Sequence, residues 1–121
     1  MANLKLSIVD QSPVHDGKNQ AHALNDSINL AKLADELGYH RYWVAEHHAT
    51  PAYASSAPEI VIGQIAASTE KIKVGSGGVM LSHYSPYKVA EVFKHLQRFI
   101  RDESIWVLGE HRAAQNHRVS L

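Results

Sequence analysis

The chain has 121 residues, with 12 basic and 12 acidic side chains, so its formal net charge is zero. This balance argues against nucleic acid and charged membrane surfaces as partners. The absence of cysteine excludes a disulfide framework and a thiolate zinc site. The sequence contains no apolar run long enough to cross a bilayer, and its start does not resemble a secretory signal. We therefore expect a cytoplasmic protein with one small domain.

Residues 4–38 predict a strand followed by a helix. Leu4, Leu6, Ile8 and Val9 are apolar enough for a buried parallel strand. Pro13 should end that strand, because proline cannot donate a ladder hydrogen bond. Apolar residues then recur at helical spacing, namely Leu24, Ile28, Ala31, Leu33 or Ala34, and Leu37. Gly38 suits the end of this helix, because glycine adopts the left-handed conformation easily.

The next stretch predicts a short buried strand with titratable residues at its end. Residues 42–45 are aromatic, β-branched or small, and Glu46, His47 and His48 follow them. Ligands of parallel α/β sheets bind at this end of the strands, so the cluster is a candidate site. The alternative is a solvated turn with one buried, hydrogen-bonded histidine. Successive strand side chains point to opposite faces, so we expect at most one of the two histidines to face the site.

Residues 56–67 predict a second helix that begins with a capping box. Ser56 can cap it, Pro58 suits its first turn, and Glu59 completes the box. Its apolar residues are mostly small, which allows close packing on another helix, within the chain or in a dimer. Ordinary packing on the sheet is the alternative that we favour.

Residues 72–81 predict a third strand that contains three glycines, at Gly75, Gly77 and Gly78. Glycine weakens a strand unless its backbone approaches something closely. One interpretation is a flat ligand, such as a flavin ring, lying against bare backbone; the other is a β-bulge or a bend. The run is not a phosphate-binding loop, because no Gly-Lys-Ser/Thr follows it.

A third helix should begin at Ser85 and Pro86. Its apolar face consists of Val89, Val92, Phe93 and Leu96. A strand followed by a helix thus occurs three times, which predicts an α/β fold with a parallel sheet.

These motifs, in this order, resemble those of the luciferase-like monooxygenases. The matching segments are Ala45-Glu46-His47-His48, Ser55-Ser56-Ala57-Pro58, the run from Val74 to Leu81, and Pro86 with Val89-Ala90-Glu91. The resemblance covers residues 4–97 and is greatest to the bacterial luciferase-like class of oxidoreductases. It implies the N-terminal portion of a (β/α)8 TIM barrel, with about three βα units.

The resemblance also implies a function. Members of the family use reduced flavin, usually FMN and in some cases a deazaflavin, together with O2 to oxidise a small organic substrate. A flavin reductase supplies the reduced flavin. His47 corresponds to the catalytic histidine of luciferases, an imidazole that moves protons near neutral pH, and Glu46 would lie beside it.

The cofactor residues implied by the resemblance lie in the third strand. Ser76, Gly77 and Gly78 would contact the flavin, and a cis peptide bond of the family falls on Gly77–Gly78. Such a bond costs about 2.5–4 kcal/mol without proline. Ser12, after the first strand, would face the substrate.

The sequence departs from the family after residue 97. A complete barrel needs about 250 residues, and the expected fourth strand, Tyr-Pro-Gly-Arg-Ile-Asp-Leu-Gly-Ile-Gly-Arg, is missing. Codons for residues 99–110, shifted by one base, permit that strand. Loss of one base near the codon of Gln97 would explain this. We therefore expect residues 1–97 to be the N-terminal part of a luciferase-like domain and residues 98–121 to be an aberrant, out-of-frame tail, in which residues 105–108 form a fourth strand or extend the third helix.

Three functions follow as hypotheses. The chain is a flavin-dependent monooxygenase in partial form, or it is an inactive remnant that self-associates through uncovered strands as a homo-oligomer. The third hypothesis is a metal site of His47, His48 and His83. Against it, these histidines lack the spacing of zinc enzymes, so we expect no metal.

Overall fold

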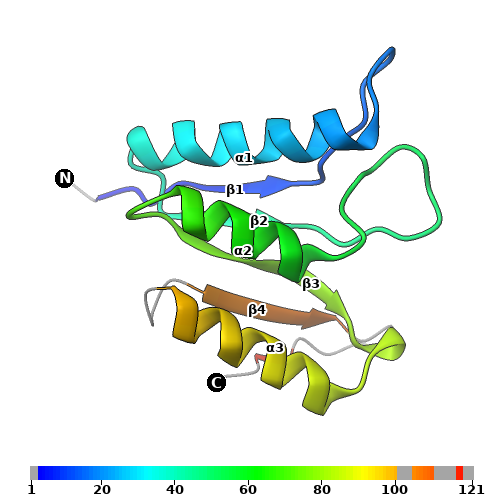
Figure 1. The fold of residues 1–121 in the computed structure, drawn as a ribbon. Helices are drawn as coiled ribbons and strands as arrows, with labels where there is room; N and C mark the ends of the chain where they lie inside the picture. Colours follow the sequence, from blue (N-terminus) through cyan, green and yellow to red (C-terminus); the bar gives the residue numbers. More distant parts are fainter. Residues whose placement is uncertain (1–2, 101–104, 111–116, 119–121) are drawn as a thin grey trace.

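The computed structural model describes residues 3–100, 105–110 and 117–118, the last two ranges by their backbone alone. Strands and helices alternate along the chain (Figure 1). The strands are β1 (Ser7–Asp10), β2 (Arg41–Val44), β3 (Lys73–Met80), β4 (Ile105–Glu110) and β5 (His117–Arg118). The helices are α1 (Gln20–Glu36), α2 (Pro58–Ser68) and α3 (Pro86–Phe99), with a 3-10 turn, η1 (Leu81–His83), after β3. The three predicted strand–helix units are confirmed.

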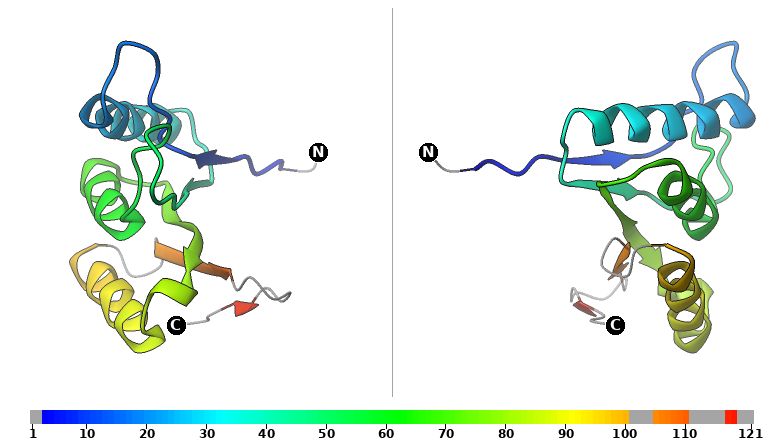
Figure 2. Two further views of the ribbon diagram at one scale, coloured as in Figure 1. Left: turned by 90° about the vertical axis from the view of Figure 1, so that its right-hand side faces the viewer. Right: turned by 60° about the vertical axis from the view of Figure 1, so that its left-hand side comes forward.

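The strands form one sheet in the order β1-β2-β3-β4-β5. Strands β1 to β4 are parallel, and β5 pairs with β4 in the antiparallel direction. Helices α1, α2 and α3 all lie on one side of this sheet (Figure 2). The prediction of an α/β fold with a parallel sheet is confirmed. Of the two possibilities for residues 105–108, the fourth strand is confirmed.

The core lies between the sheet and this helical layer. Tyr42, Val44 and Val74 contribute from the strands, and Ile62 and Ile65 contribute from α2, all of them fully buried. Burial of each such aliphatic side chain is worth about 1.5–3 kcal/mol. The sheet-packing interpretation of α2 is therefore confirmed.

In α1 the two possible core positions are now distinguished. Ala34 is buried, whereas Leu33 is 51% exposed. A small residue at this position brings α1 close to the sheet.

Strand β1 differs from the prediction of a buried strand. Val9 is 65% exposed, Leu6 51% and Leu4 79%. Ile8 packs against the core, so Val9 points to the opposite face of the sheet, which the helices do not cover (Figure 2). For Val9 the expectation of burial was wrong because it assumed that both faces of the sheet are covered. Leu4 and Leu6 lie before the strand, which begins at Ser7.

The predictions for the helix ends are confirmed in part. Ala57, and not Ser56, is the N-cap of α2, and no side chain caps the free N–H groups. Pro58 opens the helix as predicted. Ser85 is the N-cap of α3 and Pro86 follows it, although the hydroxyl of Ser85 makes no capping hydrogen bond. Gly38 has a φ of +80° just after α1, as predicted.

Asp35 joins α1 to the loop that precedes β3. Its carboxylate accepts hydrogen bonds from the backbone N–H groups of Glu70, Lys71 and Ile72, at 2.7, 2.9 and 2.7 Å. These N–H groups belong to a loop, so no strand or helix partner satisfies them. Sequence reasoning missed this contact, because the two segments are far apart along the chain.

Candidate functional site

The loops after β1 and β2 are linked to each other at the carboxyl ends of the strands (right-hand side of Figure 1). Val14 donates its N–H to the carbonyl oxygen of Ala52 at 2.8 Å, and Ala54 donates to that of Ser12 at 2.9 Å. Two residues with side chains have a positive φ among the described residues, Ser12 at +50° and Ala49 at +54°, and both lie here. Such backbone costs about 1–3 kcal/mol and clusters at functional sites.

Beneath the β1 loop lies a buried polar network. Tyr42 donates its hydroxyl to Oδ2 of Asp10 at 2.6 Å, and the N–H of Ser12 donates to Oδ1 at 2.8 Å. The hydroxyl of Ser12 lies 2.8 Å from that of Ser27. Burial, and then the hydrogen bond to Asp10, raise the pKa of Tyr42 well above its ordinary range.

Ser12 is the residue for which we predicted a substrate contact. Its side chain is fully buried, and its hydroxyl bonds to Ser27 inside the protein. This position does not match a substrate-facing side chain. The predicted role of Ser12 stays a prediction, and any contact would have to involve its backbone.

Glu46 lies at the end of β2, and its carboxylate connects that strand to the residues after β3. Its side chain is 1% exposed. Oε2 accepts the N–H of Met80 at 3.1 Å, and Oε1 accepts the hydroxyl of Tyr84 at 2.7 Å. Oε1 also lies 2.6 Å from Nε2 of His48. Burial, and then the hydrogen bond to Glu46, raise the pKa of Tyr84 to about 12.

The two adjacent histidines lie beyond the end of β2 and have different surroundings. The ring of His47 stacks on Tyr53 with centroids 4.4 Å apart, and its Nε2 is buried with no hydrogen-bond partner among the described residues. The ring of His48 instead stacks on His83 at 5.1 Å. The expectation that Glu46 lies beside His47 needs correction, because its carboxylate is turned toward His48.

The same rings bear on the metal hypothesis. His48 and His83 stack on each other, and the ring of His47 stacks on Tyr53 instead. In the part of the chain that the structure describes, no group of three or more histidine, aspartate or glutamate side chains is arranged to hold a metal ion. Likewise, no helix in that part is long and apolar enough to span a membrane.

The glycine-rich segment of β3 contains an irregularity. The pairing of β3 with β4 shifts register between Ser76 and Val79. A Cβ atom on Gly77 would lie 3.4 Å from Cβ of Trp43 and 3.6 Å from the carbonyl oxygen of Val44. The missing side chain of Gly77 therefore faces β2, and the register shift is the kind of irregularity that the β-bulge interpretation predicts.

The predicted cis peptide bond at Gly77–Gly78 is absent, since every peptide bond of the described residues is trans. The trans form is favoured by about 2.5–4 kcal/mol without proline, and the register shift bends the strand without it. Ser76 lies at the start of this shift. Its side chain is fully buried, and its hydroxyl has no hydrogen-bond partner among the described residues.

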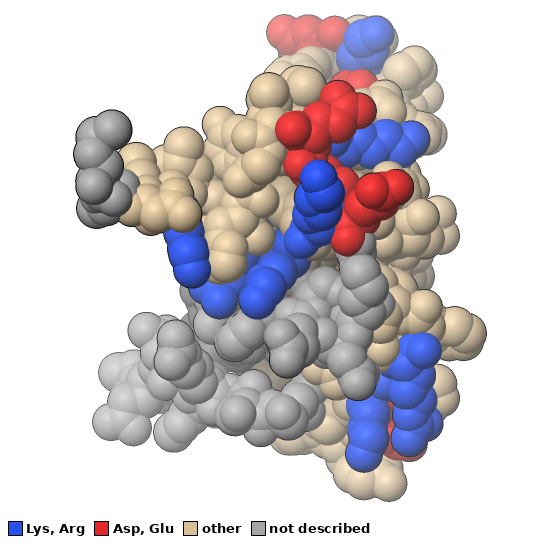
Figure 3. Space-filling model, turned by 90° about the vertical axis from the view of Figure 1, so that its left-hand side faces the viewer, with Lys and Arg blue, Asp and Glu red and all other residues tan. Residues whose placement is uncertain are grey.

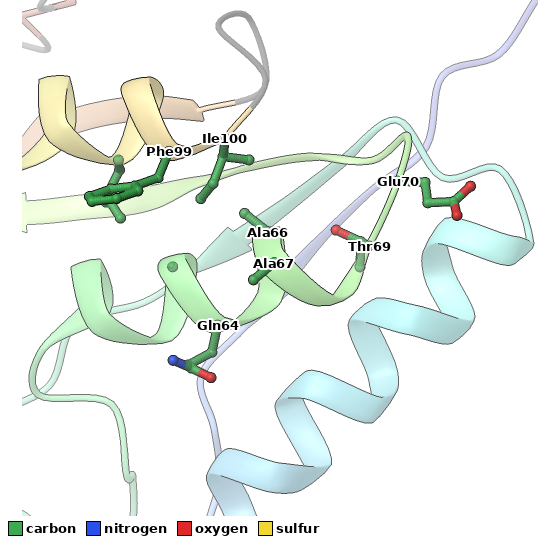
Figure 4. Close-up of a pocket in the computed structure, with 9 residues that line it drawn as sticks. Gln64, Ala66, Ala67, Thr69, Glu70, Phe99 and Ile100 are labelled. Carbon is green, nitrogen blue, oxygen red and sulfur yellow. The ribbon is translucent and has the colours of Figure 1, made fainter.

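A groove on the helical side lies away from these residues. It has a volume of about 630 Å³ and runs between α2 and α3, and Figure 4 shows Phe99 and Ile100 above Ala66. It is lined near the carboxyl ends of both helices, at the opposite edge of the sheet. A smaller cavity of about 120 Å³ lies next to Tyr84 and Val79. Its volume is below the roughly 300–1,000 Å³ typical of ligand pockets.

Charged side chains gather at that opposite edge, near the amino ends of the strands (Figure 3). Partial burial, and then the positive charges of Arg41, Lys5 and Lys73, lower the pKa of His40. The surroundings of His40 at this edge are thus positively charged.

Tyr84, Asp10 and Ser27 belong to the carboxyl edge, but sequence reasoning did not identify them. Tyr84 carried one usable signal, because it follows β3 as Glu46 follows β2. In a parallel sheet such residues meet at one edge. Ser27 carried no signal, because a serine inside a helix commonly bonds only its own backbone.

Comparison with known proteins identifies relatives of the sequence. The profile of the luciferase-like monooxygenases matches residues 4–116. The N-acetyl-S-alkylcysteine monooxygenase of Bacillus subtilis (strain 168) is 56% identical over 90 residues, which are 74% of this chain and 27% of that protein. A luciferase-like monooxygenase of Escherichia coli (strain K12) is 44% identical over 90 residues, with the same two shares. The chain thus spans less than a third of the length of these curated relatives.

Solved structures give the same result for the fold. The crystal structure of apo-MsnO8 is 52% identical, with a TM-score of 0.85 over 93% of this chain and 34% of that one. The oxygenating constituent of 3,6-diketocamphane monooxygenase from the CAM plasmid of Pseudomonas putida, in complex with FMN, has a TM-score of 0.83 at 21% identity. It covers 94% of this chain and 31% of its own, and at this identity the likeness shows the fold alone.

Proposed function

Because the chain belongs to the luciferase-like monooxygenase family, we propose that the carboxyl edge of β1, β2 and β3 forms part of a flavin site. In the proposed reaction, reduced FMN and O2 oxidise a small organic substrate, and a flavin reductase supplies the reduced cofactor. The activity of a whole family member is a proposal for this chain, which spans 27–28% of the length of its curated relatives.

The observation that carries this proposal is a set of three buried polar atoms at the carboxyl edge that have no hydrogen-bond partner among the described residues. They are the hydroxyls of Ser55 and Ser76 and Nε2 of His47. Leaving such an atom unpaired costs about 1–3 kcal/mol, so a buried group of this kind indicates a missing partner. A flavin ring, with polar atoms along its edges, is such a partner. The residues present therefore fit the cofactor.

We assign roles to the predicted residues on this basis. Ser76, Gly77 and Gly78 would lie along the flavin, and His47 would take or give a proton near the reacting atoms. Bound reduced flavin would supply the electrons and the site of reaction with O2. Glu46 would act by holding β2, β3 and Tyr84 in place, through its three hydrogen bonds.

FMN and a deazaflavin are both in use among proteins of this fold. The diketocamphane enzyme was solved with FMN, and an alcohol dehydrogenase with an F420–acetone adduct has a TM-score of 0.66 at 18% identity. We propose FMN as the cofactor and F420 as the alternative. Parallel titrations with the two compounds distinguish them.

Titration of the purified 121-residue chain with FMN, followed by fluorescence quenching, tests the proposal. We expect saturable binding in the micromolar range. Ser76→Ala should weaken it about 2- to 10-fold, which corresponds to the roughly 0.5–1.5 kcal/mol of one hydrogen bond. It should not lower the free energy of unfolding, because the hydroxyl has no partner in the protein.

Gly77→Val should abolish binding, because its side chain would press on β2. Ser68→Ala is the control, since Ser68 is exposed on α2 and bonds only to Gln64. A folded wild-type chain that binds neither FMN nor F420 would refute the proposal. An equal loss of affinity in Ser68→Ala would refute the role of Ser76.

The second candidate function is an inactive, self-associating fragment. The exposed apolar side chains of Val9 in β1 and of Leu6 just before it favour this function. The titration separates the two functions, because this fragment would associate without binding flavin.

A further inference from the structure

We propose that His48 is a second proton-transfer site at the carboxyl edge, and that Glu46 and Tyr84 position it. This inference rests on the proposed flavin function. Sequence reasoning assigned no such role to His48 or Tyr84, and the buried carboxylate of Glu46 contacts both.

The carboxylate determines which nitrogen of His48 carries a proton. An ionised carboxylate only accepts hydrogen bonds. Glu46 receives one from Tyr84 at 2.7 Å and one from Met80 at 3.1 Å, and its Oε1 lies 2.6 Å from Nε2 of His48. Nε2 of His48 therefore donates. In the neutral ring Nδ1 then carries no hydrogen and has a free lone pair.

The surroundings of His48 suit a group that exchanges protons. Its side chain is 31% exposed, whereas Nε2 of His47 is buried. The ring of His83 holds one face of His48 by stacking at 5.1 Å. The titratable groups that face this imidazole are Glu46, just after β2, and His83 and Tyr84, after β3. Glu59 on α2 in turn acts on Tyr84.

In the proposed transfer, one proton passes from the substrate to His48 and then to water. Nδ1 takes a proton from an acidic group of the bound substrate, and the ring becomes an imidazolium. The adjacent carboxylate of Glu46 stabilises that charge, as the aspartate does in a Ser-His-Asp triad. Nδ1 then returns the proton to water, and the ring is neutral again. Tyr84 contributes by fixing Oε1, the carboxylate oxygen that faces His48.

Nitrogen-15 NMR of the imidazole rings tests the positioning directly, in the wild-type chain and without flavin. At a pH well above the ordinary histidine pKa of about 6.5, we expect His48 as the Nε2–H tautomer, with Nδ1 unprotonated. Glu46→Gln should shift His48 to a mixture of tautomers, and Tyr84→Phe should shift it part of the way. Glu36→Gln, on the exposed end of α1, is the control and should change nothing.

A wild-type His48 with its hydrogen on Nδ1, on both nitrogens, or in a mixture would overturn the proposal. If Glu46→Gln does not fold, the wild-type spectrum and Tyr84→Phe still decide it. An unchanged tautomer in Glu46→Gln would also overturn it. Failure of the flavin function is seen separately, as a folded chain with the Nε2–H tautomer that binds no FMN.

Discussion

At the scale of single residues, the carboxylate of Glu46 joins three parts of the chain that are distant in sequence. It is buried, and it accepts hydrogen bonds from Met80 and Tyr84 while it contacts His48. A buried carboxylate is costly to desolvate unless such donors surround it. We therefore expect the order of the carboxyl edge to depend on the groups that donate hydrogen bonds to Glu46.

Removal of one donor tests this statement. Tyr84→Phe should lower the free energy of unfolding by about 1–2 kcal/mol, because hydrogen bonds to charged groups are worth more than neutral ones. Urea denaturation measures the change. Tyr87→Phe is the matched control, since Tyr87 is 75% exposed and should change stability by less than about 0.5 kcal/mol. Equal effects in both variants would contradict the account.

The same tyrosine should make stability depend on pH in alkaline solution. The pKa of Tyr84 is raised from 10.0 to about 12 in the folded chain. The unfolded chain thus loses this proton first as the pH rises, so stability is full below pH 10 and falls between pH 10 and about 12. Chemical denaturation across this range measures it. In Tyr84→Phe the slope should be smaller, and an unchanged slope would contradict the assignment.

At the scale of elements, Asp35 shows how one side chain places a strand. Its carboxylate accepts hydrogen bonds from three consecutive N–H groups in the loop just before β3. Their loss should reduce order at the amino end of β3 and should leave the carboxyl edge less affected.

Asp35→Ala should therefore lower the free energy of unfolding by about 2–4 kcal/mol, the range for charged hydrogen bonds when several are lost together. Thermal or urea denaturation measures the loss. Asp26→Ala, at an exposed position of the same helix, should cost less than about 0.5 kcal/mol. Comparable losses in the two variants would show that the three hydrogen bonds of Asp35 do not stabilise the fold.

The elements also show what the sequence could predict. Hydrophobic spacing and glycine located α1, α2, α3 and β1 to β3, because helices and strands bury apolar residues with different periods. Helix caps were less predictable: Ser56 had the right chemistry, but Ala57 occupies the N-cap of α2. The bulge at Ser76 was one of two interpretations, since the approach of Gly77 to β2 is a tertiary contact.

The candidate site was predictable only in part, for the same reason. Glu46 and His47 were predicted at the carboxyl edge because parallel strands end together, whereas Ser76 was predicted only from the family resemblance. It did not predict which histidine the carboxylate faces, nor the part of Tyr84. Side-chain hydrogen bonds across 34 to 38 residues have no local signal.

At the scale of the whole molecule, all three helices lie on one side of the sheet and leave the other side without a helical layer (Figure 2). Val9, which is 65% exposed, belongs to that open face, at the edge of the sheet. An uncovered edge strand invites pairing with another chain.

We expect the chain to associate as its concentration rises, and Val9→Lys to weaken that association. Sedimentation over a range of concentrations measures it. Ile60→Lys is the matched control, because Ile60 is also 65% exposed but lies on α2 in the helical layer. If the control weakens association equally, the open face of the sheet is not the contact.

The out-of-frame origin of residues 98–121 stays a prediction at this scale. Residues 98–100 form the end of α3 and its C-cap, and beyond them the structure describes only the backbones of β4 and β5. Sequencing the parent gene decides the matter. We expect the neighbouring frame to continue the barrel after the codon of Gln97, and a neighbouring frame without that continuation would refute the hypothesis.

The measurement that tests the central claim most directly is an amide NMR titration of the 121-residue chain with FMN. We predict that the largest shifts fall at residues 46–48 and 76–78, at the carboxyl edge of the sheet. Shifts centred on the groove between α2 and α3, or none in a folded chain, would contradict a flavin site at that edge.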